Sequence, residues 1–459
     1  MRECLTYDFY DMMNWHKLLS AERLGKENNE KLLNYDYARS QFQRDYDRII
    51  FSSPFRRLQN KTQVFPLPGS VFVHNRLTHS LEVASVGRSL GTILANHLKK
   101  ENDTKSCLFL DEIGNIVSAA SLAHDLGNPS FGHSGEKAIS RYFTDGDGRQ
   151  YKDLMSPLQW CDLINFEGNA NAFRILTNIF HGKQESQFAL TYSTLATLVK
   201  YPCESVAGHR KDKVYTKKYG FFASEIETFS KIADKLGIIR FQNSPLVCYR
   251  HPLTFLVEAA DDICYYIIDL EDSHRLGIFS DDEVSNLMVG LLGTDAQETL
   301  RRANDIFDSN DKVSFLRAKC INSLINECSS AFIKHLPDVM EGNFNSSLTE
   351  CLDEPFHSAL KKIDAISIDK IYNYRSVVEK EIAGYKVMSG LLEEFIPAVM
   401  DSSNHYHSKL QKLIPSQFTP INETPYTRIQ SVLDFVSGMT DLYAVELFRK
   451  IKGISFPGI

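Results

Sequence analysis

Residues 121–136 read Ser121-Leu-Ala-His124-Asp125-Leu-Gly-Asn-Pro-Ser-Phe-Gly-His133-Ser-Gly-Glu136. The segment before the His-Asp pair, residues 112–123, carries apolar side chains at spacings of three and four, which predicts a helix. The glycines and the proline that follow end this helix and allow a tight backbone path that returns His133 toward the pair. An imidazole and a carboxylate held side by side at a helix end indicate a bound metal ion.

Further ligands must come from elsewhere in the chain, because adjacent helical residues point about 100° apart. His79 lies in the first turn of a helix predicted for residues 77–98, and beside the pair it supplies a third ligand of the right type. Taken alone, a histidine there is more often a buried core or capping residue. The fourth ligand should be a carboxylate.

A helix predicted for residues 252–270 offers several carboxylates. Helical spacing places four side chains on one face: Glu258, Asp261, Tyr265 and Asp269. Asp262 and Tyr266 belong to the neighbouring strip. Aligned like charges repel, so we expect cationic or hydrogen-bonding groups to meet this face. A solvated acidic helix is the alternative, and the apolar residues between the carboxylates disfavour it.

His133 and Glu136 are three residues apart at the start of another predicted helix, so their side chains can meet. A carboxylate partner fixes the tautomer of an imidazole and raises its pKa, which suits a proton donor to a leaving oxygen. Glu136 also favours a helix N-terminus through the helix dipole. Both roles can hold together.

Two histidines and two carboxylates leave coordination positions open for water and substrate. This ligand set suits first-row divalent metals, with geometry left to choose among Mn, Fe, Co, Ni, Zn and Mg. Such an ion lowers the pKa of bound water and stabilises charge on a phosphoryl oxygen. Hydrolysis of a phosphate ester or anhydride follows.

Composition favours a mainly helical protein, since only 15 of the 459 residues are proline and 24 are glycine. The net charge of -7 argues against wholesale coating of nucleic acid. Two local basic clusters remain for an anionic substrate, Arg56-Arg57 with Lys61 and the segment 209–218, although either can be a solvated surface.

The length favours a large core with appended regions. We divide the chain into an N-terminal helical arm (1–50), a catalytic core (51–280) and a C-terminal helical region packed on the core (281–459). Further helices are predicted at 170–179 and 190–200. The basic stretch 203–220 between core helices is the best candidate for a functional loop.

Nine cysteines without a C-x-x-C motif or a disulfide-framework spacing predict a reducing compartment. The first residues contain no apolar leader segment, and no stretch approaches the ~20 uninterrupted apolar residues that span a bilayer. We therefore expect a cytoplasmic protein without a membrane partner.

Beyond these residues, the chain resembles the HD-domain phosphohydrolases, and within them the deoxyguanosine triphosphate triphosphohydrolases (dGTPases). The histidine, the His-Asp pair and the distant aspartate carry the superfamily pattern. More specific matches are Arg56-Arg-Leu-Gln-Asn-Lys-Thr-Gln-Val-Phe-Pro66, Arg76-Leu-Thr-His-Ser-Leu-Glu-Val83, Phe166-Glu-Gly-Asn-Ala170, Leu190-Thr-Tyr-Ser-Thr-Leu-Ala196, Lys200-Tyr-Pro202 and Glu258-Ala-Ala-Asp-Asp-Ile263.

The resemblance implies an all-α fold, with the HD-domain helical core followed by additional C-terminal helices. It implies hydrolysis of a dNTP, preferably dGTP, to the deoxynucleoside and tripolyphosphate, by attack on the α-phosphorus. The metal, Mg or Mn before Fe, Co, Ni or Zn, would be bound by His79, His124, Asp125 and Asp261. Proton transfer would fall to His133, supported by Glu136.

The resemblance further places Gln63 and Asp269 at the 3'-hydroxyl of the deoxyribose, with Tyr265 against the sugar. Lys200 and Tyr201 would meet the phosphates or the sugar. It also implies a homo-oligomer, often a hexamer, and in some members control by single-stranded DNA or by dNTPs.

One departure from the family's pattern falls in the loop after the His-Asp pair: Asn128 and Ser130 stand where many relatives have His and Pro. The departure bears on phosphate contacts and not on the metal ligands. Two alternative functions stay open, an HD-domain phosphohydrolase acting on another nucleotide and a nucleotide- or DNA-binding regulator on a retired hydrolase fold.

Overall fold

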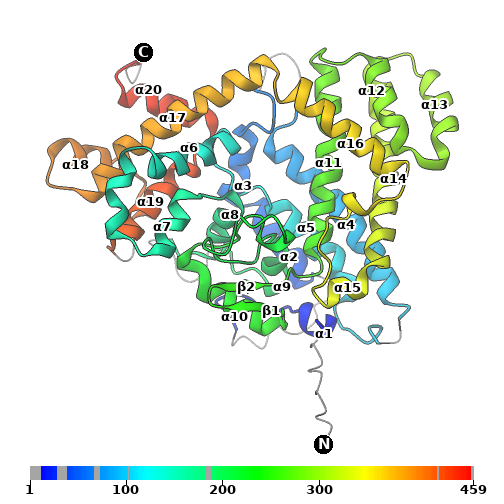
Figure 1. Cartoon of the computed structure of the whole chain (residues 1–459), viewed down its shortest axis with the longest axis horizontal. Helices are drawn as coiled ribbons and strands as arrows, with labels where there is room; N and C mark the ends of the chain where they lie inside the picture. The colour runs from blue at the N-terminus through cyan, green and yellow to red at the C-terminus, as the bar shows by residue number, and fades with distance from the viewer. Residues whose placement is uncertain are drawn as a thin grey trace, which may run out of the picture.

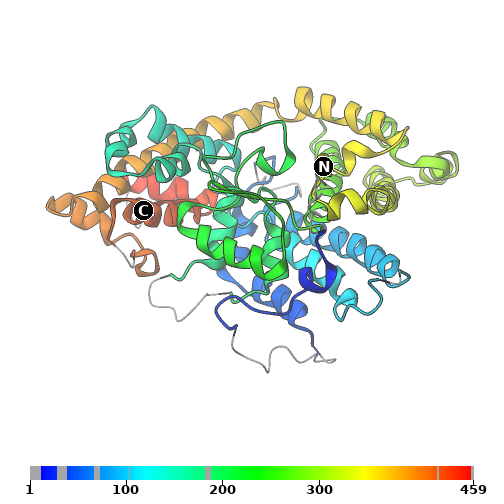
Figure 2. The same cartoon turned by 60° about the horizontal axis from the view of Figure 1, so that its bottom comes forward.

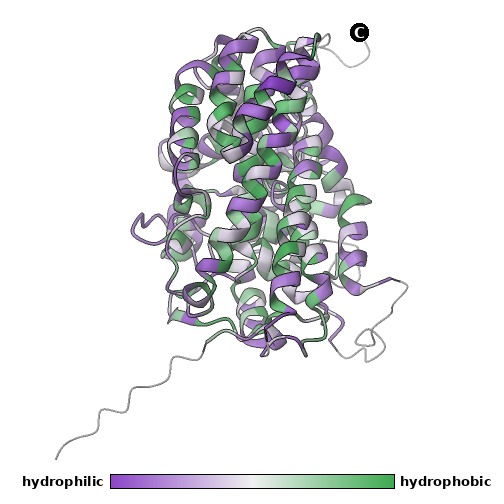
Figure 3. Ribbon diagram, turned by 90° about the vertical axis from the view of Figure 1, so that its right-hand side faces the viewer, coloured by the Kyte–Doolittle hydropathy of each residue, from purple (hydrophilic) through white to green (hydrophobic). Residues whose placement is uncertain are grey.

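The computed structural model describes residues 12–27, 39–66, 73–101, 103–180, 188–420 and 423–455. The described chain is mostly helical, as predicted, and its helices surround a continuous hydrophobic core (Figure 1). Hydrophobic and hydrophilic residues alternate along individual helices, as expected for amphipathic helices (Figure 3). The strands β1 (Arg240–Asn243) and β2 (Leu246–Cys248) form an antiparallel pair that was not predicted.

The α-helices follow one another along the chain with these bounds: α1 Trp15–Leu18, α2 Gln41–Ile50, α3 Ser53–Arg57, α4 Arg76–Leu98, α5 Ile113–Ala123, α6 His133–Thr144, α7 Pro157–Ile164, α8 Gly168–Thr177, α9 Tyr192–Leu198, α10 Ile226–Leu236, α11 Thr254–Arg275, α12 Asp281–Met288, α13 Ala296–Asn304, α14 Ser309–Lys334, α15 Leu336–Met340, α16 Phe356–Ile366, α17 Arg375–Met400, α18 His405–Gln411, α19 Pro425–Ser437 and α20 Asp441–Ile451.

The helices α4, α5 and α11 pack against one another at the centre of the fold. Asn75 caps α4 by accepting a hydrogen bond from the backbone N–H of Thr78, whose hydroxyl donates back to Asn75. The helices α4 and α5 approach closely, since a Cβ added at Gly91 would lie 2.9 Å from the Cα of Gly114. The predicted helices 77–98 and 112–123 are confirmed, and His124 follows α5 as its C-cap.

Two predicted helices are displaced or shortened by their caps. The helix α8 starts at Gly168, two residues before the predicted start, because Glu167 serves as its N-cap. The helix α9 starts only at Tyr192 because Thr191 caps it, and it ends at Leu198 instead of Lys200.

The helix α11 runs to Arg275, five residues beyond its predicted end. The acidic residues of its last turns are buried and paired. Glu271, for example, accepts hydrogen bonds from Arg275 and Arg317.

The predicted N-terminal arm is described only in part, because residues 1–11 and 28–38 lie outside the described ranges. Its described part is tied to the core by Arg23, a fully buried side chain that donates to Asp45 and to the main-chain oxygen of Ala189. The stretch 203–220 is irregular except for a short 3₁₀ turn at Val214–Thr216. Its tyrosines, Tyr215 and Tyr219, are buried.

Among the C-terminal helices, α14 packs against α4 and α11 of the core, and α17 packs against α6 and against α19. In Figures 1 and 2, α17 extends in orange across the molecule from α16 toward α18. Buried Arg174 of α8 donates to both carboxylate oxygens of Asp434 in α19, each at 2.8 Å, and to Glu225 at 2.7 Å. Within the described ranges, no helix is both long and apolar enough to span a membrane.

Candidate active site

A cavity of about 570 Å³ lies where α4, α6, α11 and α17 converge. Its lining includes most of the predicted site residues: Gln63, His124, Asp125, His133, Glu136, Lys200, Tyr201, Asp261 and Tyr265. The other two predicted residues, His79 and Asp269, are buried side chains that contact this lining. The structure therefore gathers residues that are up to about two hundred positions apart in the sequence.

The four predicted metal ligands form one cluster. His79 Nε2 lies 3.1 Å from Asp261 Oδ1, and His124 Nε2 lies 3.4 Å from the same oxygen. His124 Nε2 is also 3.6 Å from Asp125 Oδ1. One ligand atom each of His79, His124 and Asp125 lies within 4.8 Å of the other two, so these residues can hold a metal ion.

The tautomer of His124 fits this use. Its Nδ1 lies 2.6 Å from the carbonyl oxygen of Ser121, which can only accept, so Nδ1 carries the proton. In the neutral ring the lone pair is therefore on Nε2, a buried atom without a hydrogen-bond partner. A second hydrogen bond of this kind is the usual way in which proteins orient a metal-binding histidine.

The electrostatics of the cluster also favour a cation. Burial would lower the pKa of His124, but the carboxylates Asp125 and Asp261 outweigh it and raise that pKa to about 9. Burial would raise the pKa of Asp261, yet the two histidines hold it well below its ordinary value. A buried cluster with two ionised carboxylates requires positive charge, and its nitrogen and oxygen donors fit a divalent metal ion.

Sequence reasoning missed two residues that orient Asp125. Arg76 Nη1 donates to Asp125 Oδ2 at 2.7 Å, and the side-chain amide of Asn128 donates to Oδ1. Arg76 precedes His79 by three residues on the same face of α4, a spacing that was visible in the sequence. Asn128, one of the departures from the family pattern, therefore contacts a predicted metal ligand.

The predicted contact between His133 and Glu136 is confirmed at 2.7 Å between Nδ1 and Oε2. His133 is 73% exposed at the cavity, whereas Glu136 is buried and also accepts from the backbone N–H of Gly168 at 2.8 Å. Only glycine allows this approach, because a Cβ at position 168 would lie 2.6 Å from Glu136 Oε1 and 2.4 Å from Asn128 Oδ1. The burial of Glu136 opposes ionisation, but His133 lowers its pKa.

The acidic face of α11 meets partners, as expected. Glu258 accepts from Arg250 at 2.8 Å and pairs with Lys200 at 3.1 Å. Burial acts against ionisation of Glu258, yet these two cations lower its pKa to about 2. The off-face residue Asp262 accepts from the hydroxyl of Thr349 at 2.7 Å, although it also reaches the cavity.

The C-terminal region supplies one wall of the cavity, which the sequence did not reveal. Tyr372 stacks on Tyr265 with ring centroids 6.0 Å apart, and its hydroxyl donates to Asp269 at 2.8 Å. Near this wall, Gln63 Oε1 is buried without a hydrogen-bond partner. Lys380 of α17 also lines the cavity and donates to the main-chain oxygen of Val64.

The two basic clusters of the sequence differ in their relation to the cavity. In the first cluster, none of the three basic residues Arg56, Arg57 and Lys61 lines the cavity. Lys61 is buried and donates to the main-chain oxygens of Asn128 and Ser437. Its role is therefore to tie the loop after the His-Asp pair to α19. In the second cluster, one lysine, Lys218, lines the cavity.

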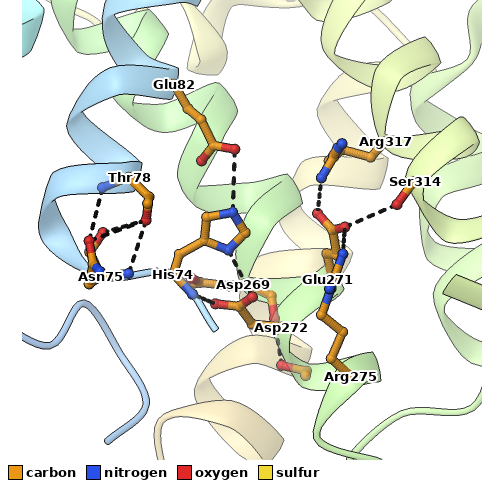
Figure 4. Close-up of polar contacts among 11 residues, drawn as sticks. His74, Asn75, Thr78, Glu82, Asp269, Glu271, Asp272, Arg275, Ser314 and Arg317 are labelled. Carbon is orange, nitrogen blue, oxygen red and sulfur yellow. Dashed lines mark hydrogen bonds and ion pairs between the residues drawn. The ribbon is translucent and has the colours of Figure 1, made fainter. Parts of the chain in front are cut away.

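Next to the cavity, His74 clamps α4 to α11, and Figure 4 shows its ring between Glu82 and Asp272. Nδ1 lies 2.8 Å from Asp272 Oδ1 and Nε2 lies 3.3 Å from Glu82 Oε1. The backbone N–H of His74 also donates to Asp272 at 2.9 Å. The clamp fixes the start of α4, one turn before His79, against the helix that carries Asp261.

The clamp predicts a pH-dependent contribution to stability. Burial alone would lower the pKa of His74, but Asp272 and Glu82 raise it to about 10. The stabilisation is therefore complete below the ordinary value of 6.5 and is lost as the pH rises through about 10. We expect His74→Gln to lower the Tm most below pH 6.5, with the difference from wild type shrinking toward pH 10.

The control is His97→Gln, a change near the C-terminal end of α4 at a partly exposed ring 3.9 Å from Glu101. This variant should show little change in Tm at any pH. A His74→Gln deficit that is constant between pH 6 and pH 10 would contradict the clamp's charge.

Known proteins similar to this chain include phosphohydrolases. Residues 351–450 match the family described as the phosphohydrolase-associated domain. The chain is 39% identical over 460 residues to a deoxyguanosinetriphosphate triphosphohydrolase-like protein of Synechocystis sp., which covers 96% of this chain and 100% of that protein. A protein of the same name from Listeria monocytogenes is 32% identical over 477 residues, again covering 96% and 100%. A deoxyguanosinetriphosphate triphosphohydrolase of Yersinia enterocolitica is 31% identical over 487 residues, covering 89% of this chain and 93% of that protein.

Proposed function

Because the chain belongs to the family of deoxyguanosinetriphosphate triphosphohydrolases and their like-named relatives, a family of hydrolases, we propose that it hydrolyses a dNTP, dGTP first among them, to the deoxynucleoside and tripolyphosphate. The observation that carries the proposal is the cluster of His79, His124, Asp125 and Asp261 beside the His133–Glu136 pair in one cavity. Relatives named as dGTP hydrolases support the choice of substrate.

The four clustered residues would hold a divalent ion, Mg or Mn before Fe, Co, Ni or Zn. A cation bound there would polarise the phosphoryl oxygens and lower the pKa of water. His133, oriented by Glu136, would protonate the 5'-oxygen of the departing deoxynucleoside. Arg76 and Lys200 add positive charge for the triphosphate.

The part of the cavity lined by Gln63, Tyr265 and Tyr372 suits a deoxyribose. We assign the 3'-hydroxyl to Gln63, whose buried Oε1 needs a donor, and to Asp269. Burial raises the pKa of Asp269 to about 7. Tyr265, stacked on Tyr372, would lie against the sugar where a 2'-hydroxyl would clash.

We further propose a homo-oligomer, a hexamer as the first assembly to test, with single-stranded DNA or dNTPs as candidate effectors. A reducing, cytoplasmic setting agrees with the cysteines, since the eight that fall in the described ranges are all free thiols. We retain the division into an arm (1–50), a core (51–280) and a C-terminal region (281–459).

Metal removal tests the proposed function directly. Protein treated with a chelator and desalted should release no tripolyphosphate from any dNTP, because the histidines and carboxylates are left without a cation. Added Mn²⁺ or Mg²⁺ should restore the release of tripolyphosphate. Ion-exchange chromatography of the four dNTPs and GTP, each with and without single-stranded DNA and each other dNTP, measures the products.

The outcomes separate the alternatives. Hydrolysis of a nucleoside monophosphate or cyclic nucleotide without tripolyphosphate would favour another phosphohydrolase. Tight oligonucleotide binding without turnover of any nucleotide would favour a regulator. Full activity after chelation would contradict the metal site.

A further inference from the structure

The basic segment 209–218 sends one residue into the active site. Lys211, Lys213 and Lys217 are exposed, whereas Lys218 lines the cavity and is only 33% exposed. Its Nζ lies 3.0 Å from Oε1 of Glu167, a side chain that is 5% exposed. Lys218 is therefore held in place by a buried carboxylate instead of being a solvated surface charge.

Glu167 and Glu136 are two buried carboxylates at the same place in the fold. Glu167 is the N-cap of α8, and the next backbone N–H, that of Gly168, donates to Glu136 Oε1 at 2.8 Å. Buried like charges this close disfavour each other's ionisation. Burial first, and then the charge of Glu136, raises the pKa of Glu167.

Lys218 offsets this repulsion. Its ammonium acts on both carboxylates, and after burial and His133 it is the next cause acting on Glu136, whose pKa it lowers. Burial would lower the pKa of Lys218 itself, but Glu167 and Glu136 raise it. The ammonium of Lys218, about eighty residues away in the sequence, thus supplies part of the positive charge that keeps Glu136 ionised beside His133.

We propose that Lys218, anchored by Glu167, is a positioning residue that holds the Glu136 carboxylate in its ionised form against His133. The inference rests on the proposed function, in which His133 donates the proton to the leaving oxygen. Tyr201 and His209 are further titratable groups near Lys218, and Lys137 and Tyr385 line the adjoining pocket with it.

A rival assignment makes Lys218 a direct ligand of the substrate phosphates. The two assignments differ in the role of Glu167. For a phosphate ligand, Glu167 only competes with the substrate, so its removal should lower KM. For a positioning residue, Glu167 and Lys218 act on Glu136 with opposite signs, so their removal should shift the pH dependence in opposite directions.

The kinetic experiment compares Lys218→Met, Lys218→Arg and Glu167→Gln with wild type, and uses Lys213→Met as the matched control from the same segment. We expect Lys218→Met to lower kcat about tenfold with KM changed less than about threefold. The acidic limb of its pH profile should move up by about one pH unit, the lower end of the effect of a neighbouring charge on a carboxyl group.

Glu167→Gln should move the acidic limb to lower pH, Lys218→Arg should restore the wild-type profile, and Lys213→Met should match wild type. An increase in KM for Lys218→Met with an unmoved acidic limb would overturn the proposal in favour of phosphate binding.

A second readout needs no turnover. In full-length protein carrying ¹³C-labelled glutamate, the signal of the Glu136 side-chain carboxyl is identified by its loss in Glu136→Gln and followed with pH. The midpoint of this carboxyl titration should lie higher in Lys218→Met than in wild type and lower in Glu167→Gln.

This readout separates the two proposals. Opposite shifts in a protein that hydrolyses no dNTP would leave the positioning role standing and the proposed function rejected. Hydrolysis by wild type together with an unshifted midpoint in both variants would reject the positioning role alone. Lys218→Gln serves if Lys218→Met unfolds, because it also removes the charge while its side-chain amide can still donate to Glu167.

Discussion

Replacing Asp261 by asparagine should lower the rate of dNTP hydrolysis by on the order of 10³-fold or more, because the change removes the carboxylate that lies within 3.4 Å of both cluster histidines. Asparagine keeps the size of the side chain, so the fold should be preserved. The metal content of the purified variant should fall together with its activity.

The control is the neighbouring change Asp262→Asn, which we expect to cost less than about tenfold in activity. Burial, with Glu258 and Asp261 nearby, raises the pKa of Asp262 to about 7, so much of its charge is already absent at neutral pH. An asparagine oxygen can still accept the hydroxyl of Thr349. The measurements are kcat and metal content for both variants, and a larger loss at Asp262 would reject the assignment of ligands on α11.

The second large effect concerns stability. Arg174→Met should lower the free energy of unfolding by about 3–5 kcal/mol, because it leaves the buried carboxylates of Asp434 and Glu225 without their cation. Methionine keeps the length of the aliphatic stem, so the loss reports the charge and the hydrogen bonds more than the packing.

Urea denaturation followed by circular dichroism measures this loss. Arg301→Met is the matched control, since its carboxylate partner Glu298 and the arginine itself are mostly exposed, and an exposed ion pair contributes little to stability. Equal losses in the two variants would contradict the view that Arg174 locks the C-terminal region to the core.

The features that the sequence predicted well depend on local signals. The helices α4 and α5 were found because their apolar spacing is regular and because glycine, proline and capping residues mark their ends. His133 and Glu136 were paired from a spacing of three within one helix, and the measured contact confirms it. The gathering of His79 with the His-Asp pair was inferred from residue type, and the packing of α4 on α5 brings it about.

The features that were missed depend on contacts between distant segments. Tyr372 and Lys380 line the cavity, but they come from a region whose sequence shows amphipathic helices and no motif of catalytic residues. Lys218 was one basic residue among several, and nothing local distinguished it from its exposed neighbours. The end of α11 was placed too early because its last turn is stabilised by buried acidic residues whose partners lie far away in the sequence. In each case the partner that decides the outcome lies tens to hundreds of residues away.

The wall that Tyr372 and Lys380 contribute has a consequence for synthesis of the protein. All four clustered histidines and aspartates leave the ribosome before the residues that close the nucleotide cavity, because the latter lie beyond position 370. A nascent chain can therefore assemble its cation cluster while the cavity still lacks one side. Under the proposed function, the binding site for the substrate is complete only after the residues beyond position 370 have been synthesised and packed against the core.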